Sequence, residues 1–319
     1  MPCVDMSLDK LYEYQGINPK PADFDEFWER GLAEMNAIDP CPVLTPVDCR
    51  SKIADVFDLT FKSTKGATIS AKFARPKNMK EKAPAILMFH GLSGASDSYM
   101  RLLSYVSQGY CVANMDCRGQ GGYSDDAGSP KGSTYSTPFA RGLDGDPDDL
   151  YYRDVFLDTA MLARVVMSMD CVDETRVGVR GGSQGGGLSI ACAALVPSIK
   201  LCSPTYPYLS DYKRVWEMDL AKGAYEGMRY HFRYFDPMHE REDEIFTKLG
   251  YIDIQHLAPR IKAKVMMATG LMDTTCPPST QFAAFNKMTC EKEVKIYPDF
   301  GHEKLWGQED IEFNFFAEL

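Results

Sequence analysis

The chain of 319 residues carries 45 acidic and 35 basic side chains, which gives a formal net charge of −10. Nucleic acids and anionic membranes both require a basic face, so this balance disfavours either as the main partner. Hydrophobic residues make up 45% of the chain and charged residues 25%, as in ordinary globular proteins. No linker or repeat divides the sequence, and we therefore expect one domain over residues 1–319.

The N-terminus lacks the basic start and apolar core of a secretory signal. The most apolar run, residues 83–89, is far shorter than the ~20 residues that span a bilayer. These features predict a cytoplasmic protein.

Ten cysteines are spread along the chain without a Cys-x-x-Cys pair, which favours free, mostly buried thiols over disulfides or a zinc site. His231 and His239 lie eight residues apart, which does not match a helical metal pair. We expect these two histidines at the surface or facing a partner, and no metal or cofactor.

Residues about 1–50 are expected to form an N-terminal extension. Within it, the apolar spacing of residues 23–37 predicts an amphipathic helix with Asp23 as its N-cap. Two β-like runs follow at residues 56–62 and 68–75, and they predict a hairpin.

From residue 83 the pattern alternates between buried strands and helices. This alternation predicts a mostly parallel sheet with helices on both faces, the α/β arrangement. Two segments interrupt it. Residues 119–149, rich in Gly, Ser, Asp and Pro, are too long for a simple connection, and residues 206–259 predict a helical insertion. The expected strands are 85–89, 111–115, 176–179, 264–268 and 294–297, and the expected helices are 99–107, 151–169, 184–196, 277–288 and one from about 308.

The strongest chemical signal is Gly181-Gly182-Ser183-Gln184-Gly185, a G-x-S-x-G sequence between a predicted strand and a predicted helix. A nucleophilic serine on so tight a turn needs glycine neighbours, because side chains there would clash. A phosphate-binding loop would end in Gly-Lys-Ser/Thr, and this loop has no lysine. The motif therefore predicts an α/β-hydrolase nucleophile.

Ser183 needs a base, and in this fold the acid and the histidine follow the serine in the chain. His302 comes just after the last predicted strand and Asp273 just after the strand before it, so we predict a Ser183–His302–Asp273 triad. Asp299 and Glu303 are too close in sequence to face the imidazole well. The remaining histidines after the serine fall in the insertion or at its edge: His231, His239 and His256.

Acyl transfer also requires two donors for the oxyanion. The amide of Gln184 should supply one, and the amide of Leu92, in the loop after residues 85–89, should supply the other. We expect His90 in that loop to be a structural hydrogen-bonding residue.

In these motifs the sequence resembles the acetyl xylan esterases and cephalosporin C deacetylases of carbohydrate esterase family 7. The matches run along nearly the whole chain. They are Arg118-Gly119-Gln120-Gly121, Asp173-Glu174-Thr175-Arg176, Gly181-Gly182-Ser183-Gln184-Gly185-Gly186, Tyr206-Pro207-Tyr208-Leu209, Gly270-Leu271-Met272-Asp273, Cys276-Pro277-Pro278-Ser279-Thr280 and His302-Glu303.

The resemblance implies a cytoplasmic, metal-independent enzyme that deacetylates small sugars, notably xylo-oligosaccharides, and cephalosporin C. It also implies a ring-like hexamer. The motif residues beside the triad would support the site structurally, and they are Arg118, Gly119, Gln120, Gly181, Gly182, Gly185 and Glu303. Leu92 stands where the family often has tyrosine, a change that leaves the backbone donor in place.

The residues themselves also allow two other functions, a different hydrolase activity and a binding module. A general carboxylesterase or a peptidase could use the same triad, although about eighty residues before the first buried strand cannot supply a peptidase's gating domain. A binding module that retains the hydrolase fold has no need for an intact triad and two oxyanion donors.

Overall fold

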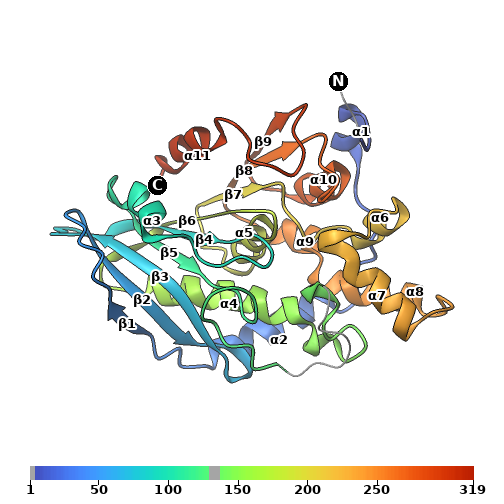
Figure 1. Cartoon of the computed structure of the whole chain (residues 1–319), viewed down its shortest axis with the longest axis horizontal. Coiled ribbons are helices and arrows are strands. Elements are labelled where there is room, and N and C mark those ends of the chain that lie inside the picture. Colours follow the sequence, from blue (N-terminus) through green and yellow to red (C-terminus); the bar gives the residue numbers. More distant parts are fainter. Residues whose placement is uncertain (1–3, 129–136) are drawn as a thin grey trace.

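The computed structural model describes residues 4–128 and 137–319. Its centre is a nine-stranded sheet with the strand order β1-β2-β3-β5-β4-β6-β7-β8-β9 (Figure 1). The strands are β1 (Val43–Pro46), β2 (Ala54–Lys62), β3 (Thr68–Pro76), β4 (Ala83–Phe89), β5 (Cys111–Met115), β6 (Val172–Gly182), β7 (Leu201–Thr205), β8 (Lys264–Gly270) and β9 (Lys292–Tyr297).

The sheet is mostly parallel. The first strands form an antiparallel edge, with β1 pairing β2, β2 pairing β3 and β3 pairing β5. The strands from β5 to β9 in the sheet order all pair in parallel. This confirms the predicted hairpin of residues 56–62 and 68–75 and the predicted mostly parallel sheet.

Helices cover both faces of the sheet. Side chains of α2, α4 and α5 belong to the larger apolar cluster, whereas α3 and α11 pack in the smaller one on the opposite face (Figure 1). The helices are α1 (Leu8–Glu13), α2 (Phe24–Asn36), α3 (Tyr99–Val106), α4 (Tyr151–Met167), α5 (Gln184–Leu195), α6 (Tyr212–Glu217), α7 (Glu226–Phe235), α8 (Glu242–Leu249), α9 (Ile254–Leu257), α10 (Pro278–Lys287) and α11 (Gln308–Phe316).

The sequence of strand β4 is apolar at every position because apolar clusters cover both of its faces. Ala85, Leu87 and Phe89 belong to the larger cluster, and Ile86 and Met88 belong to the smaller one. Successive side chains of a strand point to opposite faces, so a strand with helices on both sides must be apolar throughout.

Two strands, β1 and β7, were not predicted from the sequence. All four residues of β1 are exposed, so this edge strand carries no alternation of apolar and polar residues. Strand β7 is mostly buried, but it contains Ser203 and Pro204, and a proline argues against a central strand. Strand β6 is also longer than the predicted residues 176–179, and α4 ends two residues before the predicted Met169.

Asp23 occupies the N-cap position of α2 as predicted, but its side chain makes no capping hydrogen bond. Its carboxylate instead accepts a hydrogen bond from the Tyr251 hydroxyl in the predicted insertion. The nearby indole of Trp28 donates to the Tyr251 carbonyl oxygen at 3.1 Å. The N-terminal helices and the insertion therefore pack directly on one another.

The insertion between β7 and β8 is helical, as predicted, and it contains α6 to α9. The expectation for His231 is wrong: it is 3% exposed, and its ring stacks on Phe235 on the same helix. The helical periodicity places His231 on the inner face of α7, where Met228 and Phe232 are also buried. His239 is exposed, as expected.

The nine described cysteines are all free, and five of them are buried, as predicted. None of the helices in the described ranges is both long and apolar enough to cross a membrane. Part of the long segment at residues 119–149, namely 129–136, lies outside the described residues, as do residues 1–3.

Candidate active site

Ser183 sits on a sharp turn between the last residue of β6 and the first residue of α5. Its φ is +58° and its ψ is −121°, a backbone conformation that side-chain-bearing residues rarely adopt. A Cβ on Gly181 would lie 2.5 Å from the carbonyl of Gly185, and one on Gly185 would lie 2.1 Å from the Phe89 oxygen. The backbone segments approach so closely that only glycine fits at both positions.

The three predicted triad residues lie in one hydrogen-bonded chain. The distance from Ser183 Oγ to His302 Nε2 is 3.0 Å, and that from His302 Nδ1 to Asp273 Oδ2 is 2.8 Å. Because a carboxylate only accepts hydrogen bonds, Nδ1 carries the proton in this arrangement. The lone pair of Nε2 is then directed at the serine hydroxyl.

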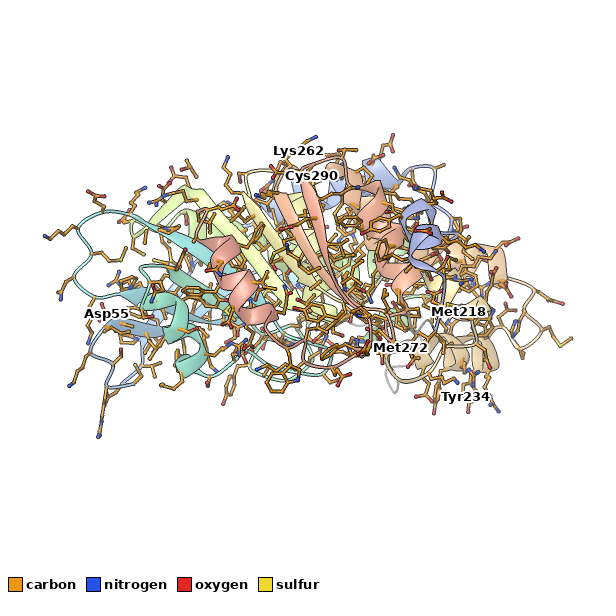
Figure 2. All side chains as sticks on the ribbon, turned by 90° about the horizontal axis from the view of Figure 1, so that it is seen from above. Asp55, Met218, Tyr234, Lys262, Met272 and Cys290 are labelled. Atoms are coloured by element: carbon orange, nitrogen blue, oxygen red, sulfur yellow. The ribbon has the colours of Figure 1, made fainter. Side chains whose placement is uncertain are left out.

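Asp273 is fully buried at the carboxyl end of β8. Its Oδ1 accepts hydrogen bonds from the amides of Thr275 and Cys276, both at 2.8 Å, which leaves Oδ2 for the imidazole. Its neighbour Met272 lies at the opposite edge of the sheet from Lys262 and Cys290, which precede β8 and β9 (Figure 2). The site therefore occupies the edge where parallel strands end, the usual ligand edge of α/β sheets.

Two backbone amides beside Ser183 have no acceptor within the described residues: those of Leu92 and Gln184. The first turn of a helix leaves its amides free, which accounts for Gln184. Leu92 is in the loop after β4 and lines the same cavity as Ser183. Free amides in this position can stabilise an oxyanion.

A cavity of about 440 Å³ opens onto Ser183 and His302. The ring of Tyr206 forms one wall, with its centroid 4.6 Å from that of His302. Arg101 and Arg180 line the cavity as well. A seryl hydroxyl, an imidazole and free amides in one cavity can carry out acyl transfer.

The family model for acetyl xylan esterase (AXE1) matches residues 1–319. The chain belongs to the acetyl xylan esterase family. It is therefore a carboxylic ester hydrolase with the α/β-hydrolase fold.

Solved structures and a curated relative agree with this membership. The structure of acetyl xylan esterase 1 from Thermoanaerobacterium sp. JW/SL YS485 is 52% identical, with a TM-score of 0.97 over 98% of this chain and 99% of that one. An acetyl xylan esterase from Paenibacillus sp. R4 is 34% identical, with a TM-score of 0.94 and the same coverage. Acetyl esterase Axe7A of Xylanibacter ruminicola is 28% identical over 92% of this chain and 68% of its own.

In this esterase Gln120 connects the loop after β4 to the nucleophile turn. Its Oε1 accepts from the amide of Ser93 at 2.8 Å, and its Nε2 donates to Gln184 Oε1 at 2.7 Å. Tyr152 donates to the same Gln184 oxygen at 2.6 Å. These bonds hold the segments that carry the two free amides in a fixed relation.

Arg118 is 1% exposed and lies away from the cavity residues, in a bidentate pair with Asp158 on α4. Its Nε and Nη2 donate to the two carboxylate oxygens at 2.7 and 2.5 Å, and Nη2 also donates to Thr64 at 3.1 Å. Burial raises the pKa of Asp158, while the guanidinium acts in the opposite direction. Arg118 lies in the loop after β5 and connects this loop to the β2–β3 turn and to α4, which is a structural role and not contact with the cavity.

His90 hydrogen-bonds through both ring nitrogens to backbone. Its Nε2 accepts from the Cys117 amide at 3.0 Å, so Nδ1 carries the proton and donates to the Gly91 oxygen at 2.7 Å. Burial lowers the pKa of His90, which favours this neutral form. Glu303 accepts from the amide of Gly301 at 3.1 Å and so steadies the turn that carries His302.

Three residues that line the cavity were not predicted from the sequence as site residues: Tyr206, Arg101 and Arg180. Tyr206 directly follows β7, and its place after a buried strand would have indicated the site had that strand been recognised. The two arginines carry no local motif. One group of possible metal-ligand atoms lies here, with its atoms within 4.8 Å of one another: those of Asp273, Cys276 and His302. The aspartate and histidine atoms are already hydrogen-bonded within the Ser183–His302–Asp273 chain. The group therefore fits a triad better than a metal site.

Proposed function

We propose that this enzyme removes O-acetyl groups from small acetylated sugars by a serine acyl-enzyme mechanism. The observation that carries the proposal is the hydrogen-bonded chain Ser183–His302–Asp273 beside the free amides of Leu92 and Gln184. Family membership supplies the ester-hydrolase chemistry, and the relatives described above are named as acetyl or acetyl xylan esterases.

In the first half-reaction Ser183 Oγ attacks the acetyl carbonyl carbon while His302 Nε2 takes its proton. The carbonyl oxygen becomes an oxyanion that the amides of Leu92 and Gln184 stabilise. His302 then gives its proton to the departing sugar oxygen, and the acetyl group stays on Ser183. Water repeats the sequence and releases acetate, while Asp273 keeps Nδ1 protonated and stabilises the imidazolium.

We further propose xylo-oligosaccharides and cephalosporin C as substrates, a cytoplasmic location, no cofactor and a homo-hexamer. These expectations rest on the family resemblance. The cavity of about 440 Å³ is compatible with a small acetylated sugar.

The test compares acetate release from acetylated xylo-oligosaccharides, cephalosporin C and a longer-chain ester, for wild type and Ser183→Ala. We expect rapid release from the acetylated substrates and a loss on the order of a millionfold in Ser183→Ala. Circular dichroism should show that the variant keeps its fold.

Each other result would change the assignment. Faster cleavage of the longer ester would favour a general carboxylesterase. An unchanged rate in purified Ser183→Ala would remove Ser183 from the mechanism. No activity on any of these esters would contradict the acetylesterase proposal.

A further inference from the structure

Two cysteines meet at the edge of the sheet opposite the active site. Cys111 is the first residue of β5, and Cys171 directly precedes β6, so both lie where strands begin, whereas Ser183 follows the end of β6. Cys111 Sγ is 3.7 Å from the Cys171 carbonyl oxygen, which also accepts from the Ala83 amide at 2.9 Å. The two residues are 60 positions apart in the chain but adjacent in the fold.

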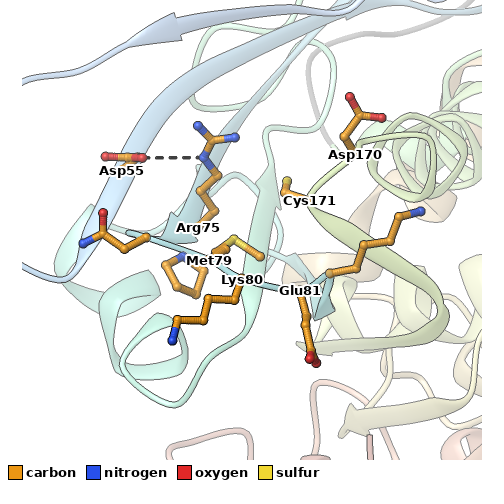
Figure 3. A pocket seen from close by; sticks show the side chains of 10 residues that line it. Asp55, Arg75, Met79, Lys80, Glu81, Asp170 and Cys171 are labelled. Carbon is orange, nitrogen blue, oxygen red and sulfur yellow. Dashed lines mark ion pairs between the residues drawn. The ribbon is translucent and has the colours of Figure 1, made fainter.

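Cys171 is accessible from solvent, whereas Cys111 is buried. Cys171 lines a cavity of about 600 Å³, larger than the one at Ser183 (Figure 3). Arg75 belongs to the same cavity, where its Nε lies 3.6 Å from Asp55 Oδ2. The remaining charged lining residues are Lys80, Glu81, Lys82 and Asp170.

The surroundings of Cys171 favour its thiolate. The neighbouring Cys111 thiol, together with Arg75, lowers the pKa of Cys171 to about 6 against the opposing effect of burial. The proximity of Cys171 and burial raise the pKa of Cys111. Cys171 is thus the more nucleophilic of the two sulfurs, and Cys111 remains a protonated thiol.

Several other cysteines in the described part of the chain lack this combination of an accessible sulfur and a lowered pKa. Cys41 is exposed, but the neighbouring Asp39 raises its pKa. Burial raises the pKa of the thiols inside the molecule, Cys117, Cys192, Cys202 and Cys276. Cys171 combines partial exposure to solvent with a second thiol beside it.

We propose that Cys171 and Cys111 form a peroxide-reactive pair, with Cys171 as the attacking thiol and Cys111 as the resolving thiol. The Cys171 sulfur attacks hydrogen peroxide, an S–O bond forms, the O–O bond breaks, and the departing hydroxide takes a proton to become water. Cys171 is now a sulfenic acid. The Cys111 sulfur attacks it, the S–S bond forms, the S–O bond breaks, and hydroxide leaves as water with the Cys111 proton. Two thiols are oxidised to a disulfide and one peroxide is reduced to two waters.

Alkylation of the native full-length enzyme at pH 7 tests the first step. Iodoacetamide should label Cys171 at least about tenfold faster than the exposed Cys41, because far more of Cys171 is thiolate at this pH. Peptide mass spectrometry of the wild-type chain reads both sites. Equal or slower labelling of Cys171 would overturn the proposal.

Oxidation with a slight excess of hydrogen peroxide tests the second step. We expect the loss of two alkylatable thiols and a reductant-sensitive link between the peptides that contain Cys111 and Cys171. Cys171→Ser should abolish the link, and the matched variant Cys41→Ser should leave it intact. Both variants should release acetate at the wild-type rate, which checks their folding. If Cys111 remains alkylatable in wild type after Cys171 has been oxidised, the pairing is wrong.

Discussion

At the scale of single residues, the geometry of the site depends on which atoms of each side chain are already hydrogen-bonded. Asp273 uses one carboxylate oxygen for two backbone amides and the other for His302. The aspartate can therefore neither rotate nor hydrogen-bond elsewhere without breaking three contacts. This fixed position explains how His302 can present the nitrogen without a proton to Ser183.

Asp273→Asn tests that tautomer. The amide group would favour the wrong proton position on His302, and kcat should fall by about four orders of magnitude while KM changes little. Asp299→Asn is the matched control, because Asp299 is also acidic and near in sequence to His302 but exposed. Steady-state acetate release measures both. Wild-type turnover in Asp273→Asn would contradict the role of Asp273.

Leu92 allows a test that separates a backbone amide from a side chain. Leu92→Ala keeps the N–H and should change the rate only modestly. Leu92→Pro removes the N–H and should lower kcat by about 10² to 10³, the effect of losing one oxyanion donor. Near-ultraviolet circular dichroism checks that the loop variants fold. Equal rates in the two variants would assign the oxyanion donor elsewhere.

At the scale of elements, the Arg118–Asp158 pair joins parts that are distant in sequence. Arg118 lies in the loop after β5 and Asp158 lies on α4, and both are fully enclosed. The amide of Ser93 and the side chain of Gln184 meet at Gln120, two residues after Arg118. Arg118 and Gln120 thus contact the segments that carry the site without lining the cavity themselves.

Arg118→Met should therefore lower the stability of the fold more than it lowers the rate of acetate release. It leaves Asp158 buried without its counter-ion, and the free energy of unfolding in urea should drop by about 3–5 kcal/mol. Arg50→Met is the control, because Arg50 is exposed and its change should stay within about 0.5 kcal/mol. An equal effect of the two substitutions would show that the buried pair contributes nothing special.

At the scale of the whole molecule, β1 forms an exposed edge of the sheet. Val43 and Leu44 of this strand are 54% and 36% exposed, respectively. An unpaired strand edge with apolar side chains is open to pairing with another chain. This surface is compatible with the assembly that the family resemblance implies.

Light scattering of the purified protein tests the assembly. A hexamer should have six times the chain mass of 35.7 kDa. A monomer at micromolar concentration would contradict the proposed assembly, and acetate release measured on the same sample would show whether the site requires it.

Local signals in the sequence were sufficient for most of the fold. The continuous apolar run at residues 85–89 predicts a doubly covered strand because neighbouring residues alone determine which faces are apolar. Strands β1 and β7 were missed, since an exposed edge and an internal proline remove that signal. The side-chain partner of Asp23 lies in the insertion, far away in the sequence, so local periodicity could not give it. The burial of His231 was missed although the helical spacing of α7 places it beside Met228 and Phe232.

The sequence by itself determined the α/β alternation, the glycine-flanked turn at Ser183 and the chain order of serine, aspartate and histidine. These features depend on turn chemistry and on the period of neighbouring residues. The tertiary structure alone decided that Ser183 and His302, 119 positions apart, lie 3.0 Å from one another. It also placed the side chain of Gln120 in hydrogen-bonding distance of Gln184, and Cys111 beside Cys171. Such contacts follow from the order of strands in the sheet, in which β5 lies between β3 and β4, and no local pattern encodes that order.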